Sequence, residues 1–173
     1  MKQKRLFHDA SLCDGCGFCQ LVCAVKHCRQ WNHYQSRIKI FHDLEGTACH
    51  ALYCAHCQDA PCIMTCLMNT IYKDEKNGVT LRDLMQCIGC RACELACPFD
   101  AAMFDVLQEK VVNCDLCGGR PACVDICPKS ALSFEYNEEH LDRNRFQAAA
   151  LKVAYLTPGV RESFGKEGDE QCR

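Results

Sequence analysis

The sequence lacks the patterns that mark several classes of enzyme and membrane protein. It contains no glycine-rich dinucleotide motif, no phosphate-binding loop and no recognisable pair of nucleophile and base, so we expect no catalytic residues. No stretch approaches the roughly 18 consecutive apolar residues that predict a membrane helix. The first residues, MKQKRLFHDASLC, contain no apolar segment typical of a secretory signal. We therefore expect a cytoplasmic protein that does not span the membrane.

Apolar side chains other than cysteine are also scarce. The hydrophobic fraction of 49% includes 19 cysteines among the 173 residues, and without them little remains to build a core. Disulfides or bound metal must then help to hold the fold. The odd number of cysteines and the reducing environment of the cytoplasm both argue against a disulfide framework. We therefore expect a metal-binding protein.

Sixteen of the cysteines fall into four sets of four, and Cys28, Cys49 and Cys172 lie outside them. The first set is Cys13, Cys16, Cys19 and Cys23, and the second is Cys54, Cys57, Cys62 and Cys66. The third set is Cys87, Cys90, Cys93 and Cys97, and the fourth is Cys114, Cys117, Cys123 and Cys127. Proline follows the last cysteine of the third and fourth sets (Pro98 and Pro128), whereas Ala24 and Leu67 follow the last cysteine of the first and second.

The spacing within these sets is typical of iron–sulfur proteins. In the first and third sets the pattern C-x2-C-x2-C-x3-C lets three thiolates bind three corners of a [4Fe–4S] cube. The fourth cysteine then points away and binds the other cluster of a pair. A zinc site is built from two C-x2-C pairs and gives no reason for the third cysteine of such a run. Sixteen thiolates suffice for four [4Fe–4S] clusters.

Short apolar segments between the sets predict strands, with a short helix after the last cysteine of each set. The predicted strands lie in RLFHD, Ser36–Asp43, AAMFDVLQEKVVNC and ALSFEY, and TIYKDEKNGVTL predicts a hairpin around Asn77-Gly78. The predicted fold class is therefore α+β, with two ferredoxin-like units related by a pseudo-repeat.

The spacing of the sets leaves their pairing into units partly open. The predicted hairpin joins the second and third sets into what looks like one unit, but the short link between the third and fourth sets also permits a sequential pairing. If the second and third sets pair, the first and fourth must meet. The units are then 4–48 with 105–136, and an inserted unit at 49–104.

The segment 137–173 predicts a helical tail. Asn137 is suited to cap the helix, an apolar stripe follows, and Thr157-Pro158-Gly159 ends it. The apolar stripe allows two interpretations, packing on the same chain or docking on another subunit, including a second copy of the chain.

A few residues outside the ligand pattern need an interpretation of their own. Cys28 and Cys49 are interpreted as small buried residues, and Cys172 as an exposed thiol. His56 lies between two cysteines of the second set and can donate a hydrogen bond to a sulfur. For Trp31 and Tyr34, packing or contact with a protein partner is favoured over contact with nucleic acid.

The four sets, in this order, resemble the iron–sulfur electron-transfer subunit of the dimethyl sulfoxide reductase family over residues 4–136. Related subunits serve formate dehydrogenases, hydrogenases, carbon monoxide dehydrogenase and tungsten aldehyde oxidoreductases. The compact fourth set, CDLCGGRPACVDICPKSAL, is most similar to the cytoplasmic versions that accompany the last two. The first set of this family commonly lacks the proline, in keeping with Ala24, whereas Leu67 departs from the plain ferredoxin pattern.

The resemblance implies four groups of ligands, which we number as clusters. Cluster 1 takes Cys13, Cys16, Cys19 and Cys127, and cluster 2 takes Cys23, Cys114, Cys117 and Cys123. Cluster 3 takes Cys54, Cys57, Cys62 and Cys97, and cluster 4 takes Cys66, Cys87, Cys90 and Cys93.

The function implied by the resemblance is electron transfer without catalysis. Such a subunit passes single electrons between a catalytic subunit that holds tungsten, molybdenum or nickel and a further electron-transfer subunit or ferredoxin. A tungsten aldehyde oxidoreductase is the best guess for the catalytic partner. The alternatives are another enzyme of the same group, or a free soluble polyferredoxin that has no fixed partner. No nucleic-acid partner is expected.

Overall fold

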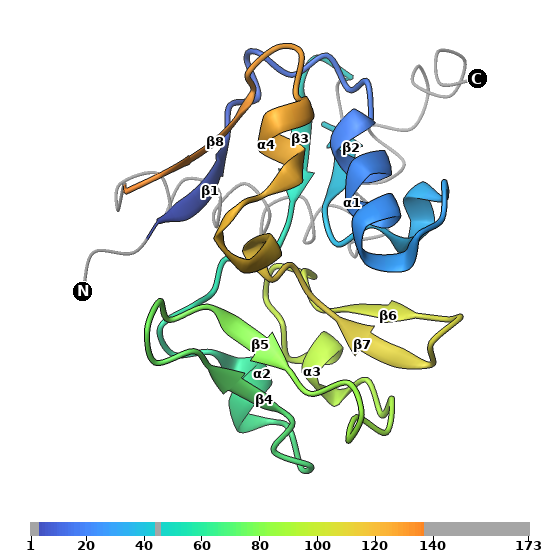
Figure 1. Ribbon diagram of the computed structural model, residues 1–173, viewed down its shortest axis with the longest axis vertical. Coiled ribbons are helices and arrows are strands. Elements are labelled where there is room, and N and C mark those ends of the chain that lie inside the picture. Colours follow the sequence, from blue (N-terminus) through green and yellow to red (C-terminus); the bar gives the residue numbers. More distant parts are fainter. Residues whose placement is uncertain (1–3, 44–45, 137–173) are drawn as a thin grey trace, which may run out of the picture.

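The computed structural model describes residues 4–43 and 46–136, in which helices are short and strands come in pairs (Figure 1). The longest helix in this part of the chain is α1 (Phe18–Cys28). The other α-helices there are single turns: α2 (Pro61–Met64), α3 (Ala92–Leu95) and α4 (Ala122–Ile126). Two 3-10 turns, η1 (His33–Gln35) and η2 (Leu116–Gly119), complete the helical part. The predicted tail at 137–173 lies outside the described residues.

The strands form antiparallel pairs. The pairs are β1 (Arg5–His8) with β8 (Leu132–Glu135), β2 (Lys39–His42) with β3 (Cys49–Leu52), β4 (Ile71–Lys73) with β5 (Thr80–Arg82), and β6 (Met103–Asp105) with β7 (Lys110–Val112). Three of these pairs join neighbours in the sequence, whereas in the β1–β8 pair Arg5 lies opposite Glu135. The mixed helix and sheet composition predicted from the sequence is thus confirmed.

The two ends of the described chain meet in one half of the molecule. Figure 1 shows β1, β8, α1 and α4 in its upper half, together with β2 and β3, and the middle of the chain in its lower half. Helix α1 packs on α4, and the Lys26 ammonium group donates a hydrogen bond to the Arg120 carbonyl, 3.2 Å away. The first and fourth cysteine sets are brought together in this way.

The predicted hairpin between the second and third sets is confirmed. Strands β4 and β5 pair on either side of Asn77-Gly78, and Gly78 has the positive φ of 61° that glycine adopts readily. The turn is longer than two residues, because the Asp74 N–H donates to the Val79 carbonyl at 2.9 Å and the Gly78 N–H to the Asp74 carbonyl at 2.7 Å. Strand β3 is an addition that the sequence pattern does not predict.

The predicted position of the short helices is wrong. Each helix begins near the third cysteine of its set, and α2, α3 and α4 end before or at the fourth instead of following it. Proline explains two of these ends, because the residue before proline is restricted to extended conformations. Cys127, which precedes Pro128, has φ −70° and ψ 110° and ends α4.

The first set differs, since α1 continues through Cys23 to Cys28. Ala24 is completely buried in the middle of this helix. A proline at this position would remove a hydrogen bond of the helix and break it. The helix ends instead at Arg29, which has a left-handed φ of 56°.

The core of the described residues is small, and thiols form part of it. One cluster of buried residues combines the apolar side chains of Leu6, Ile38, Leu116 and Leu132 with four cysteines: Cys19, Cys23, Cys114 and Cys123. A second cluster, in the lower half of Figure 1, contains Ile71, Ala102 and Val111 around Cys93. The buried sulfurs therefore take places that apolar carbon occupies in ordinary domains.

The turn between β6 and β7 packs against the loop of the third set. Gly89 has φ +70°, and a Cβ atom placed on it would overlap the carbonyl oxygen of Glu109. The Lys110 ammonium group donates a hydrogen bond to the Cys87 carbonyl in the same region. Only glycine fits at position 89 without moving the turn.

Replacing Gly89 with alanine is therefore expected to destabilise the protein by about 2–4 kcal/mol, through left-handed strain and overlap with a backbone atom. Gly118 is the matched control, because it has φ +69° and no atom within 4 Å of the added Cβ. Gly118→Ala should cost only about 1 kcal/mol. The thermal midpoint of the iron-loaded protein, measured without oxygen, should fall further for Gly89→Ala. Equal midpoints for the two variants would contradict the predicted overlap.

Candidate iron–sulfur sites

The four cysteine sets share one backbone feature. In each set the residue before the second cysteine has a positive φ: 73° at Gly15, 49° at His56, 70° at Gly89 and 54° at Leu116. A left-handed residue next to right-handed ones directs successive N–H groups into the same hollow, which favours anions and iron–sulfur clusters. The loops thus have a backbone suited to a negatively charged group of sulfur ligands.

His56 is held in this strained conformation by a partner on β5. It is 1% exposed, and its Nδ1 accepts a hydrogen bond from the Thr80 N–H at 3.0 Å. Burial, and then the charges of Arg5 and Lys73, lower the pKa of His56 to about 3. The Nδ1 atom of this neutral ring lies 3.7 Å from the Cys54 Sγ. Since Nδ1 already accepts the Thr80 proton, it cannot donate to that sulfur as the sequence suggested.

The cysteines predicted for cluster 1 line one pocket. Cys13, Cys16, Cys19 and Cys127 surround it together with apolar side chains such as Ile40 and Leu132. Burial, and then the thiols of Cys13, Cys16 and Cys127, raise the pKa of Cys19 to about 12. Three cysteines of the first set therefore face the last cysteine of the fourth set.

The cysteines predicted for cluster 2 show the reciprocal arrangement. Burial raises the pKa of Cys123 to about 12, and the nearby Cys23 and Cys117 also raise it. Burial likewise raises the pKa of Cys114, with Cys23 and Cys123 among its charged neighbours. The Cys23 sulfur also accepts a hydrogen bond from the Arg37 N–H at 3.3 Å. The last cysteine of the first set thus lies among the first three of the fourth.

The second and third sets meet in the lower half of Figure 1. Burial, and then Cys97, Cys62 and Cys57, raise the pKa of Cys54 to about 12. These four are the cysteines predicted for cluster 3. Of those predicted for cluster 4, Cys66 and Cys93 pack in one core cluster, and the grouping of Cys87 and Cys90 with them stays a prediction.

The charge balance of these groups fits a metal cluster. Buried thiols close to one another resist ionisation, because each negative charge is poorly solvated and repels the others. Iron supplies the missing positive charge and keeps its cysteine ligands deprotonated. The left-handed loops, the grouped sulfurs and the cysteine-only donors are together the arrangement that [4Fe–4S] clusters require.

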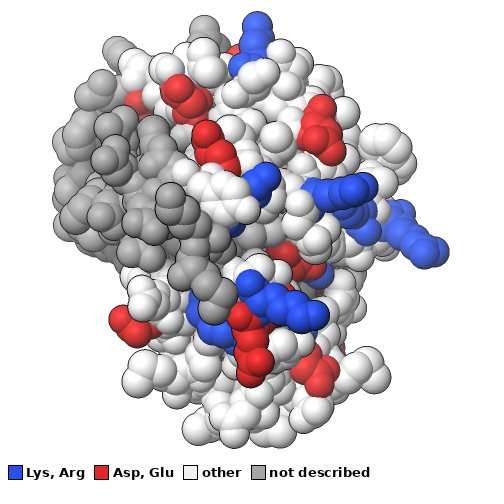
Figure 2. All heavy atoms as spheres, turned by 60° about the vertical axis from the view of Figure 1, so that its left-hand side comes forward, with Lys and Arg blue, Asp and Glu red and all other residues white. Residues whose placement is uncertain are grey.

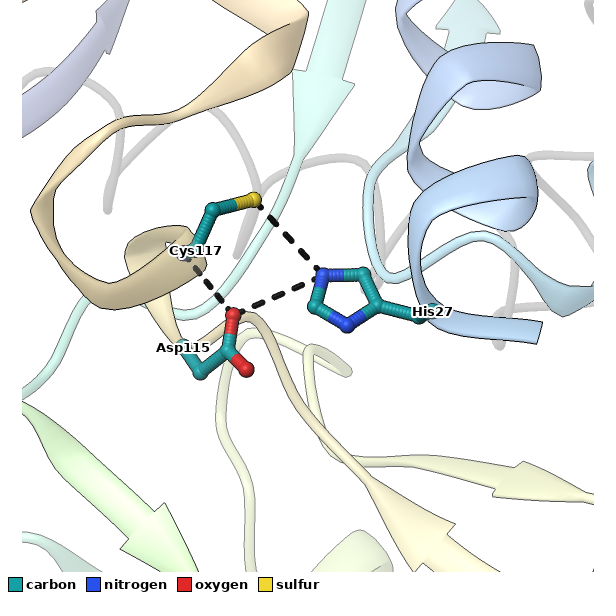
Figure 3. Close-up of side chains that lie close together, drawn as sticks. All are labelled: His27, Asp115 and Cys117. Carbon is teal, nitrogen blue, oxygen red and sulfur yellow. Dashed lines mark hydrogen bonds and ion pairs between the residues drawn. The ribbon is translucent and has the colours of Figure 1, made fainter. Parts of the chain in front are cut away.

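A histidine and a carboxylate lie beside Cys117, at the edge of this arrangement (Figure 3). His27 Nε2 is 3.6 Å from the Cys117 Sγ and 3.5 Å from the Asp115 Oδ1. Both carboxylate oxygens are engaged, since Oδ1 accepts the Cys117 N–H at 2.9 Å and Oδ2 accepts from Arg37 at 2.9 Å. Burial and Arg37 lower the pKa of His27. The carboxylate thus fixes the Cys117 loop, and the ring covers the sulfur.

Of the two described cysteines outside the four sets, one has the predicted environment and one does not. Cys28 is half-buried rather than buried, and its sulfur is 3.8 Å from the Gln108 amide nitrogen. Cys49 is buried as expected, but it lies beside a predicted ligand: burial raises its pKa, and contact with Cys13 adds to the rise. Its sulfur is also 3.5 Å from His42 Nδ1. Cys172 lies outside the described residues.

The aromatic pair near the end of α1 is exposed. Trp31 is 80% exposed and Tyr34 78% exposed, so neither is packed into the described core. No helix in residues 4–43 and 46–136 combines the length and the apolar character needed to cross a bilayer.

Comparison with known proteins gives matches across most of the chain. A family model described as a 4Fe-4S dicluster domain matches residues 47–137. The polyferredoxin-like subunit of an aliphatic sulfonate oxidoreductase from Pyrococcus furiosus is 39% identical over 66% of this chain and 66% of its own length. The chain thus spans just under two thirds of that relative.

Two further relatives are subunits of reductases. The electron transfer subunit of a thiosulfate reductase from Salmonella typhi is 32% identical, over 75% of this chain and 73% of its own length. A subunit of the anaerobic dimethyl sulfoxide reductase of Haemophilus influenzae is 32% identical, over 91% of this chain and 84% of its own length. The cysteine sets, the geometry of their loops and these matches agree: the chain belongs to the family of 4Fe-4S dicluster domain proteins, whose members include iron–sulfur subunits of oxidoreductases.

Proposed function

We propose that the chain is a non-catalytic electron-transfer subunit that binds four [4Fe–4S] clusters through the sixteen cysteines assigned above to clusters 1 to 4. When bound, the clusters accept and release single electrons. The cysteines hold them in a fixed order.

The observation that carries this proposal is a continuous series of electrostatic influences between thiols of successive clusters. Cys19 of cluster 1 raises the pKa of Cys123 of cluster 2. Cys54 of cluster 3 raises the pKa of Cys114 of cluster 2. Cys93 of cluster 4 raises the pKa of Cys62 of cluster 3. These influences support an order of 1, 2, 3, 4 for the passage of electrons, or the reverse.

The proposed division places residues 4–48 and 105–136 in one unit and residues 49–104 in the other, and the β2–β3 and β6–β7 pairs join the units across these limits. The pairing of β1 with β8 and the packing of α1 on α4 support the first unit. A repeated turn supports the pseudo-repeat: the third residue after the last cysteine is left-handed in three sets, at Asn69 (φ 52°), Asp100 (φ 55°) and Ser130 (φ 51°). The division assigns clusters 1 and 2 to one unit and clusters 3 and 4 to the other.

Exposed apolar side chains favour a subunit over a free polyferredoxin. Met64, Leu67, Met85 and Leu95 are all exposed, close in sequence to cysteines of the second and third sets. Figure 2 shows no charged side chain at the lower end of the visible face. In Figure 1 the chain between α2 and β4 forms this lower end. Apolar surface of this kind is typical of proteins that dock on a partner.

The proposed catalytic partner is an oxidoreductase subunit of the tungsten aldehyde oxidoreductase type, which the compact fourth set favours. Carbon monoxide dehydrogenase, formate dehydrogenase and hydrogenase are the alternatives, and a second electron carrier completes the path. The relatives described above, as subunits of oxidoreductases, support a multi-subunit setting. We propose a cytoplasmic location and self-association through the tail as a further contact.

Metal analysis of the native protein, purified without oxygen together with whatever stays bound, tests the function. We expect about sixteen iron atoms per chain, four for each cluster, together with tungsten, molybdenum or nickel from the partner. Iron at that level without a companion metal or protein would favour the free polyferredoxin. Zinc in place of iron would contradict both.

A cysteine exchange tests the proposed ligand groups. Cys127→Ala should damage cluster 1, although Cys127 lies in the fourth set, because its thiol faces the pocket of Cys13, Cys16 and Cys19. Reference variants define the signals: Cys16→Ala marks the loss of cluster 1, and Cys117→Ala the loss of cluster 2. Electron paramagnetic resonance of the reduced protein should match Cys127→Ala to the first.

Cys28→Ala is the control for this exchange, since Cys28 belongs to no group and should keep the full iron content. A spectrum of Cys127→Ala that matches Cys117→Ala would show that the assignment of clusters 1 and 2 is wrong.

A further inference from the structure

One cationic side chain donates directly to a predicted ligand sulfur. Arg82, the last residue of β5, directs its Nη1 at the Cys93 Sγ, 3.1 Å away. Hydrogen bonds from charged donors are stronger than those between neutral groups. Arg82 belongs to a strand and not to a cysteine loop. Its charge therefore approaches the sulfur from outside the ligand loops.

The guanidinium group is held in place on its other side. Arg82 Nε donates to the Asn113 Oδ1, and Asn113 is itself buried. The Asn113 amide nitrogen donates to the Thr80 carbonyl at 3.0 Å and to the Cys114 carbonyl at 2.7 Å. Every hydrogen-bonding atom of the Asn113 side chain is thus used, and the fork of Arg82 is fixed between Asn113 and Cys93.

A positive charge at the Cys93 sulfur favours the form of cluster 4 with the greater negative charge. From these contacts we propose that Arg82 is a positioning residue that raises the reduction potential of cluster 4. The inference rests on the proposed function. When one electron passes from cluster 3 to cluster 4, the first is oxidised and the second reduced, and no proton is transferred. Arg82 favours the electron on cluster 4, because hydrogen bonds and charge at a ligand sulfur tune the potential of a cluster.

Other cations near the same sets are placed differently. Arg91 follows Cys90 but is 57% exposed and forms an ion pair with Glu94 at 2.6 Å, so solvent and a carboxylate screen its charge. Lys73 donates to the carbonyls of His56 and Gly78. Among these three cations only Arg82 donates to a sulfur, and Arg91 offers a matched control that removes one charge from the same region.

The test is a redox titration, followed by electron paramagnetic resonance, of the full chain purified with its clusters. Arg82→Gln should lower the midpoint of one cluster, changing its one-electron equilibrium by at least about tenfold, which corresponds to about 59 mV. Arg91→Gln should change it several times less. Arg82→Lys keeps the charge but loses the fork, so its midpoint should lie between those of the wild type and Arg82→Gln.

The number of clusters tests the proposed function, and their potentials test the role of Arg82. Fewer than four clusters in the wild-type protein would contradict the proposed function. Four clusters with an unchanged midpoint in Arg82→Gln would overturn the role of Arg82 alone. If Arg82→Gln fails to retain iron, Arg82→Lys decides: a midpoint below that of the wild type supports the role, and a wild-type midpoint overturns it.

Discussion

The arrangement of the thiols depends on one backbone constraint, the left-handed residue before the second cysteine of each set. For a residue with a side chain this conformation costs roughly 1–2 kcal/mol. Gly15 and Gly89 avoid most of that cost, whereas His56 and Leu116 need support from elsewhere. His56 receives it from the Thr80 N–H, and Leu116 is buried in the core. The loops of the second and fourth sets are therefore stabilised by tertiary contacts.

Those contacts connect the ligand loops to the rest of the chain. The buried sulfurs of the first and fourth sets form one core with Leu6, Ile38 and Leu132, so cluster binding and packing stabilise the same residues. Asn113 donates hydrogen bonds both to the Thr80 carbonyl, at the start of β5, and to the Cys114 carbonyl. It thereby connects the two halves of the molecule. In a fold with so few apolar side chains, the ligands and the core cannot be separated.

Local signals in the sequence could predict part of this structure. The hairpin around Asn77-Gly78 follows from turn chemistry, and the grouping of cysteines into sets follows from spacing. Strand β3 could not be predicted, because CHAL has no clear alternation and forms a strand only beside β2. The helix positions were wrong because the cysteine spacing does not show where a helix begins.

The contacts of individual side chains were harder still to predict from the sequence. The bond from Arg82 to Cys93 and the placement of Cys49 beside Cys13 join different segments of the chain, and no local pattern marks them. The exclusion of His56 Nδ1 as a donor to the Cys54 sulfur likewise depends on the Thr80 N–H, which the fold brings to it.

The pairing of β1 with β8 has a consequence for the synthesis of the protein. The ribosome makes the chain from its N-terminus, so Arg5–His8 emerges first but has no partner until Leu132–Glu135 follows. The middle of the chain, with its own hairpins, can close earlier. The thiols of the first set are thus enclosed later than those of the second and third sets, and they stay open to iron delivery, or to oxidation, until β8 has been made.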